Sequence, residues 1–255
     1  LTGDGVVSLI EKKREATLKM YERFEKFLIE KIESKKGKSL KTKNVLPNLE
    51  EIEVFIENEL EFQIAALEDA IKHGFVNSTI GADIPFAQTS ANQLLKEVVG
   101  RNIKSVTGTS LERLKRLIAD AFESEASVSE ISTRLRELIP DMAKARADMI
   151  ARTETLSAVS LGQEVKRREF KRRYPQQAKR LKKMWLSAQD NKVRDSHEKV
   201  NEEVVGVDEK FSNGLLYPRD PAGPAEEVIQ CRCSIIDYLP EDEETTINIV
   251  GDDSP

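Results

Sequence analysis

Two cysteines and one histidine are the first residues in this 255-residue chain whose types and spacing could do chemistry. Cys231 and Cys233 are its two cysteines and stand one position apart in "EVIQCRCSII"; His197, one of two histidines, lies upstream in "WLSAQDNKVRDSHEKV". In a β-strand, residues i and i+2 point to the same face, so the two thiols would lie side by side with Arg232 opposite. A disulfide between them would close a strained small ring, which disfavours it.

A metal site is one role for this group. Zinc binds Cys sulfur and His nitrogen in tetrahedral sites. Cys231, Cys233 and His197 would supply three ligands, and Asp190 or a water molecule would supply the fourth. Such a zinc site would be structural, because no general base is evident beside an open coordination position. The alternative is two reduced cysteines packed as small apolar residues beside a hydrogen-bonded core histidine.

A basic stretch is the second group of chemical interest. From Glu164 to Lys199 the chain has 13 Lys and Arg residues against 5 Asp and Glu, although its net charge is -5. This stretch is either a solvated helix face or a surface that lies against nucleic acid or an acidic protein. The candidates for proximity to nucleic acid are Arg167, Arg168, Lys171, Arg172, Arg173, Lys182 and Lys183.

The overall composition is typical of a helix-rich protein. The chain has 39% apolar, 33% charged and only 5% aromatic residues. No apolar run approaches the roughly 18–20 residues needed to span a bilayer, so we expect no transmembrane helix. No secretory signal is visible, and two cysteines do not make a disulfide framework, so an intracellular folding environment is expected.

The elements that must position these residues follow from periodicity. Apolar residues at three- and four-residue spacing predict one helix over 5–35 and another from an Asn48 cap to a stop at Gly74. Pro140 is expected to close a further helix, after which a long helix runs to the stop at Pro175. Turn formers then cluster, and "KMWLSA" and "VIQCRCSIIDYL" are typical of strands.

These elements predict a mainly α protein with a small α+β C-terminal domain and a long helical N-terminal arm. We divide the chain into a helical domain or arm over 1–139, a mixed domain over 140–236 and an acidic tail over 237–255. The tail has seven acidic residues and no basic ones.

Three segments, taken in this order, resemble the phage Mu F-like head morphogenesis family. They are "IARTET" at 150–155, "WLSAQDNKVRDSH" at 185–197 and "FSNGLLYPRDPAGPAEEVIQCRC" at 211–233. The resemblance covers roughly residues 140–236. By position, it places the family signature on Arg152, Glu154, Trp185, Asp190, Arg194, His197, Pro221, Glu226, Cys231 and Cys233.

The resemblance implies a minor capsid protein of a tailed bacteriophage or prophage. Such a protein would associate with the portal and the capsid interior, and act in head assembly, DNA packaging or DNA ejection. Its expected partners are the portal protein, the major capsid or scaffold protein and, through weak electrostatic contact, packaged double-stranded DNA, with no membrane. It would reside in the virion, and in the host cytoplasm during assembly.

An enzyme carried in the phage head is the competing interpretation. A nuclease-like protein would use His197 as acid or base and Arg194 to stabilise phosphate charge; ADP-ribosyltransferase-like chemistry is a further variant. We expect a role without turnover, because no second histidine or clustered carboxylate pair accompanies His197 in the sequence.

Overall fold

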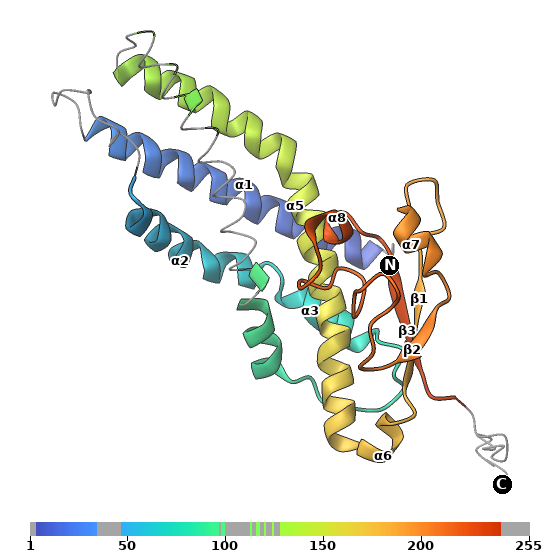
Figure 1. Cartoon of the computed structure of the whole chain (residues 1–255). Coiled ribbons are helices and arrows are strands. Elements are labelled where there is room, and N and C mark those ends of the chain that lie inside the picture. The colour runs from blue at the N-terminus through green and yellow to red at the C-terminus, as the bar shows by residue number, and fades with distance from the viewer. Residues whose placement is uncertain are drawn as a thin grey trace.

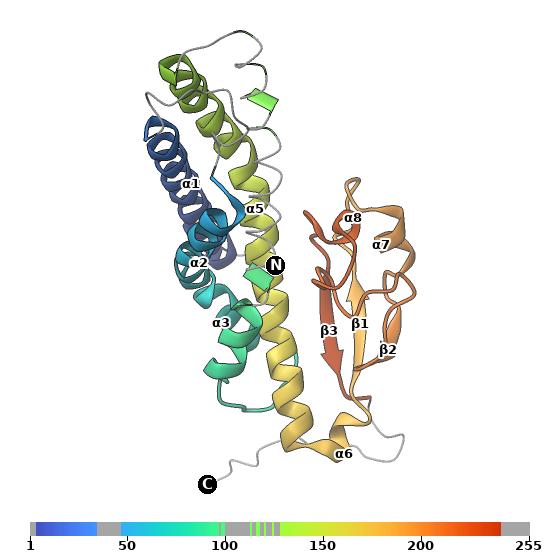
Figure 2. The ribbon, with the colours of Figure 1, turned by 60° about the vertical axis from the view of Figure 1, so that its left-hand side comes forward.

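A bundle of long helices and a small three-stranded sheet make up the protein (Figures 1 and 2). The computed structural model describes residues 4–34, 47–96, 98–99, 113, 116–117, 120, 124 and 128–240. The predicted fold class is confirmed: the protein is mainly helical, with a small antiparallel sheet near the C-terminus. Most of the predicted acidic tail lies outside the described residues. Within them, no helix has both the length and the apolar character that crossing a membrane requires.

Helix α1 (Asp4–Glu33) packs lengthwise against α5 (Val128–Arg173), and the two run antiparallel (Figure 1). The buried face of α1 includes Phe24, Leu28 and Ile32, which follow the predicted periodicity. Burial of one such side chain contributes about 1.5–3 kcal/mol, so this stripe holds the two helices together. The helix predicted over 5–35 is confirmed, and the N-terminal arm is a packed member of the bundle.

The second predicted helix is two helices, α2 (Leu49–Ala65) and α3 (Glu68–Val76). Asn48 caps α2 as predicted: its side chain accepts a hydrogen bond from the Glu51 N–H, and the Glu51 carboxylate accepts one from the Asn48 N–H, both at 2.9 Å. The prediction that Gly74 ends the helix was wrong. Gly74 lies inside α3, where a Cβ atom would meet the Val159 carbonyl oxygen of α5 at 1.9 Å. Glycine is therefore placed there by a close helix crossing.

Helix α5 runs without a break through Pro140, which was predicted to end a helix. Proline removes one backbone hydrogen bond and crowds the preceding turn, so alone it favours a stop. Here Ile139 and Met142 on either side of it are buried, and their packing holds the helical path. The predicted domain boundary at 140 thus falls within one continuous helix.

The sheet has strand order β2-β1-β3, and both pairings are antiparallel. In the register, Met184 faces Val204 on one side and Ile236 on the other. The strands are β1 (Lys182–Leu186), β2 (Val204–Gly206) and β3 (Ser234–Tyr238), and the short helices α6 (Pro175–Ala178), α7 (Asp195–Lys199) and α8 (Ala225–Val228) lie in the connections. The strand predicted around "KMWLSA" is confirmed. That around "VIQCRCSIIDYL" forms only after the cysteines, and β2 was not predicted.

A buried ion pair joins the sheet to α5. Arg167 Nε of α5 lies 2.7 Å from Asp237 Oδ1 of β3, and both side chains are buried. The backbone of Asp237 also exchanges hydrogen bonds with the Thr79 hydroxyl, in the segment after α3. Sheet, α5 and the α3 segment therefore meet at one residue.

Candidate metal centre

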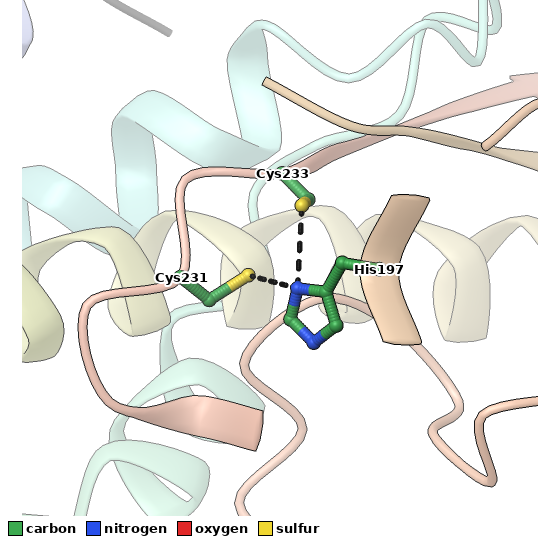
Figure 3. A group of neighbouring side chains, drawn as sticks. All are labelled: His197, Cys231 and Cys233. Carbon is green, nitrogen blue, oxygen red and sulfur yellow. Dashed lines mark hydrogen bonds between the residues drawn. The ribbon is translucent and has the colours of Figure 1, made fainter. Parts of the chain in front are cut away.

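His197, Cys231 and Cys233 converge in the C-terminal part of the protein (Figure 3). His197 projects from α7, and the cysteines lie in the segment that leads into β3. One donor atom from each lies within 4.8 Å of the other two. The three residues are 1%, 1% and 2% exposed, respectively. The predicted convergence is thus present, although the cysteines occupy a loop before the strand.

Both sulfur atoms face the same imidazole nitrogen (Figure 3). Cys231 Sγ lies 3.6 Å and Cys233 Sγ 3.4 Å from Nδ1 of His197. A neutral imidazole nitrogen that accepts a hydrogen bond has one lone pair, in the ring plane. Only one thiol hydrogen can therefore be directed along it, so the second sulfur has no comparable bond to this nitrogen.

Glu227 lies beside the other nitrogen of the imidazole ring. Its Oε2 lies 2.7 Å from His197 Nε2, and its carboxylate accepts hydrogen bonds from the Ser196 hydroxyl at 2.9 and 3.0 Å. The contact with Nε2 does not have hydrogen-bond geometry, but a carboxylate this close favours the tautomer with its hydrogen on Nε2, which leaves the Nδ1 lone pair toward the sulfurs. Metal-binding histidines are commonly oriented by such a carboxylate.

Arg219 fixes the backbone of the loop that contains the two cysteines. It is fully buried, and its guanidinium donates to the carbonyl oxygens of Cys231 at 2.9 Å and Cys233 at 2.7 Å. The same group donates to the Leu156 carbonyl and the Ser160 hydroxyl of α5. Burial lowers the pKa of Arg219. One side chain thus fixes the loop conformation and attaches it to α5.

The backbone around the loop is held in an uncommon conformation. Arg219 has φ 65° and Gln230, directly before Cys231, has φ 58°. Non-glycine residues in the left-handed region carry a conformational cost and concentrate at functional sites. At Gln230 the N–H donates to the Thr153 hydroxyl of α5, so the strained turn is anchored.

The two thiols titrate as a pair. The pKa of Cys231 is lowered, first by a hydrogen bond with the Cys233 thiol and further by His197 and Arg219. The pKa of Cys233 is raised, first by the same hydrogen bond and then by burial. The two shifts have opposite directions because both thiols take part in the same hydrogen bond. Thiolate sulfur is a good ligand for a soft cation.

The donor distances fit a tetrahedral cation. Zinc with bonds of about 2.3 Å to sulfur and about 2.1 Å to nitrogen places the sulfur and nitrogen donors about 3.6 Å apart. The observed separations of 3.4 and 3.6 Å match this edge. The nitrogen–sulfur spacing of the three residues therefore suits such an ion.

Asp190, predicted as a possible fourth ligand, lies outside this group. Its carboxylate forms an ion pair with Arg232, the residue between the two cysteines, and is exposed. The Arg232 guanidinium lowers the pKa of Asp190. This ion pair at the surface keeps the Asp190 carboxylate out of the His-Cys group.

The remaining signature residues are dispersed over the fold. Trp185 is fully buried, with its ring centroid 5.1 Å from that of His197, and Glu154 is buried in the helical bundle. Arg194 donates to the Ile229 carbonyl oxygen in the chain leading to Cys231. The other three are Arg152 and Glu226, both exposed, and Pro221, which is half-buried.

Glu227 and Arg219 have direct roles that the sequence pattern did not reveal. The family resemblance placed the signature on Glu226, which is exposed, whereas its neighbour Glu227 contacts His197. Neither a helical nor a strand period links Glu227 to His197, 30 residues upstream. The sequence shows Arg219 only as an arginine in a turn-rich segment, and an arginine in such a segment is ordinarily exposed to solvent.

The structure divides the predicted nucleic-acid-proximal residues into two sets. Arg167 is buried against Asp237, and Lys183 is buried with its amine 2.8 Å from the Leu216 carbonyl oxygen, so neither can reach DNA. Their inclusion was wrong, because a count of charges does not reveal which face of an element is buried. The accessible set, here called the basic corner, comprises Arg168, Lys171, Arg172, Arg173 and Lys182 at the end of α5 and the start of β1.

A comparison with family models places the site in context. The model described as Phage Mu protein F like protein matches residues 108–236, just over half of the chain. The chain belongs to this family. The match includes the His-Cys group, all of α5, the strands β1 and β2, and the first three residues of β3. Membership of the Mu F-like family supports a phage head morphogenesis protein that is located in the virion and interacts with other capsid components. Searches of curated proteins and of solved structures each gave no significant match.

Proposed function

We propose that this Mu F-like protein is a minor component of the phage head, located at the portal and the capsid interior. There it would act in head assembly, DNA packaging or DNA ejection, with the portal protein and the major capsid or scaffold protein as partners. The observation that carries the proposal is the family match over residues 108–236. The long helices packed side by side are consistent with this role, because they offer extended faces to neighbouring proteins.

The outer face of α2 supports a protein partner. Val54 is 53% exposed and Phe62 60% exposed on this helix. They are eight residues apart, which places them about 80° apart around the helix and about 12 Å apart along it. Two exposed apolar side chains on the outer part of α2 are available for contact with another protein.

The basic corner supports weak contact with packaged DNA. It belongs to the C-terminal part of α5 and the start of β1, which α6 connects at one end of the ribbon (Figure 2). Nearby carboxylates compensate part of its charge: Lys171 lies 2.5 Å from Asp208, and Arg172 lies 2.8 Å from Glu169. Such a surface favours nonspecific phosphate contacts over recognition of a sequence.

A role without catalytic turnover is part of the proposal. His197, the acid or base of a nuclease interpretation, is 1% exposed and faces two thiols. Arg194 is engaged with the Ile229 carbonyl. Incubation of the purified protein with DNA and RNA should give no degradation; degradation that is lost in His197→Ala would overturn this part.

Counting this protein in purified particles tests the main proposal. Quantitative mass spectrometry should find a few copies per particle relative to the major capsid protein, in both DNA-free and DNA-filled heads. Crosslinking in the same particles should join the helical bundle to the portal or capsid protein. Absence from both kinds of head would contradict the proposal and redirect attention to a free effector.

A further inference from the structure

We infer that His197, Cys231 and Cys233 bind one soft divalent cation, for which zinc fits best, in a buried site that holds the C-terminal fold together. The inference rests on the geometry of these side chains and is independent of the proposed role in the phage head. Two sulfurs approach one nitrogen lone pair, at 3.6 and 3.4 Å. A cation among the three donors satisfies all of them at once, which a single thiol hydrogen cannot.

The ligands are held in place by residues that do not bind the ion. Arg219 fixes the carbonyl groups of both cysteine residues, and the Glu227 carboxylate lies 2.7 Å from Nε2 of the imidazole. These contacts do not use the atoms that would bind the ion, so they can hold the ligands in place before it binds. Little conformational entropy remains to be lost on binding, which favours high affinity.

A buried donor lies beside the site. Nε1 of the fully buried Trp185 has no hydrogen bond of ordinary length and angle in the described part of the chain. The indole lies beside the His197 ring and in one core cluster with both cysteines. Thiolates bound to a metal accept such N–H groups more readily than neutral thiols.

The fourth coordination position goes to water. The group of possible ligands in the described chain comprises the three residues alone, and Asp190 is held by Arg232 at the surface. Three protein ligands with water in the fourth position are typical of catalytic zinc sites. Here the three donor residues are each at most 2% exposed, so a substrate has no access and we assign this ion a structural role.

Metal titration of the full chain is the decisive experiment. Reduced protein, stripped by a chelator, is titrated with Co²⁺ alone and then with Zn²⁺. We expect one Co²⁺ per chain, with sulfur-to-metal charge transfer and the ligand-field bands of a tetrahedral site, displaced by an equal amount of Zn²⁺. A spectrum without charge transfer, or no saturable binding, would overturn the inference, and this result does not depend on how any variant folds.

Four variants resolve the roles of individual residues. Cys231→Ser with Cys233→Ser should abolish the charge-transfer band. Glu227→Gln should keep one ion per chain but lower the affinity about 10- to 100-fold, as expected for a residue that orients a ligand. Arg232→Gln and Asp190→Asn are matched controls in the same loop and its ion pair, and both should bind as the wild type does. Loss of binding in Asp190→Asn, or binding that survives loss of both thiols, would refute the three-ligand site.

Discussion

Lys13 of α1 and Glu154 of α5 form an ion pair inside the helical bundle, with 2.7 Å between Nζ and Oε2. Their side chains are 1% and 6% exposed. Lys13 also donates to the Gln63 side chain of α2, so its ammonium group links α1, α2 and α5. Glu154 belongs to a segment that carries the family resemblance, yet it lies in the bundle core, away from the His-Cys group.

Removal of Glu154 should strongly destabilise the bundle. Glu154→Ala leaves the Lys13 ammonium buried without its partner, and such a loss costs about 3–5 kcal/mol. Replacement of both residues, as Lys13→Met with Glu154→Leu, removes both charges and should recover most of this loss. The free energy of unfolding from urea denaturation measures each value.

An exposed ion pair between the same two helices provides the control. Arg14 and Asp148 lie 2.6 Å apart with side chains 35% and 75% exposed. Asp148→Ala should cost at most about 1 kcal/mol, because water screens this pair. Equal losses for Asp148→Ala and Glu154→Ala would show that burial does not decide the strength of these pairs.

The crossing of α3 and α5 should not tolerate any side chain at two glycines. A Cβ atom on Gly162 would meet the Ile71 carbonyl oxygen at 1.9 Å, the counterpart of the contact at Gly74. Gly74→Ala and Gly162→Ala should each destabilise the protein by about 1–3 kcal/mol or more, because the helices must separate. Gly81→Ala, where nothing lies within 4 Å, is the matched control and should leave the thermal midpoint near its wild-type value.

Lys183 should make stability rise with pH in alkaline solution. Burial, and next the charge of Arg167, lower its pKa from 10.5 to about 8. Between these values the unfolded chain binds more protons than the folded chain, so the free energy of unfolding increases with pH. Lys183→Met removes this contribution, and its pH profile should be flatter than that of the wild type.

Urea unfolding from about pH 7 to about pH 10 measures that difference. Lys182→Met, one position away on β1 and only half-buried, is the control and should follow the wild-type profile. A Lys183→Met profile parallel to the wild type would contradict the assignment.

Loss of charge at the basic corner should weaken duplex DNA binding and its dependence on salt. In Arg172→Gln with Arg173→Gln, each lost phosphate contact should reduce the slope of log K against log salt by about 0.9. Arg136→Gln, an exposed arginine 36 positions earlier on α5, is the control. If both proteins show the same slope as the wild type, DNA does not lie against the basic corner.

Removal of zinc should lower the stability of the wild type. A ligand that binds only the folded chain, present at a hundred times its Kd, contributes about 2.7 kcal/mol. A chelator should therefore lower the thermal midpoint of the wild type and leave that of Cys231→Ser with Cys233→Ser unchanged. A midpoint of the wild type that is insensitive to chelator would show that no ion stabilises the fold.

Local patterns were sufficient to predict much of the helical framework. The apolar spacing of α1 and the Asn48–Glu51 capping box depend on residues within one or two turns, which sequence shows directly. The convergence of His197 with both cysteines was also predicted, with help from the family resemblance. Its metal ligation stays a prediction.

Features that depend on contacts between distant residues could not be predicted. Pro140 continues a helix because the bundle packs around it, and Gly74 lies inside a helix because α5 crosses there. In the sequence, Arg167 and Lys183 have the pattern of surface charges. In the fold, β3 covers Arg167 and the loop around Leu216 covers Lys183. In each case the partner that decides the outcome lies far away along the chain.

The continuous helix α5 also sets a distance. Its 46 residues extend about 70 Å at 1.5 Å per residue, from Val128 to the arginines at its C-terminal end. A capsid protein bound to the first turns and DNA against the last would be held apart by one continuous helix, which bends along its length (Figure 1). The protein would then work as a molecular ruler that spaces the shell from its contents.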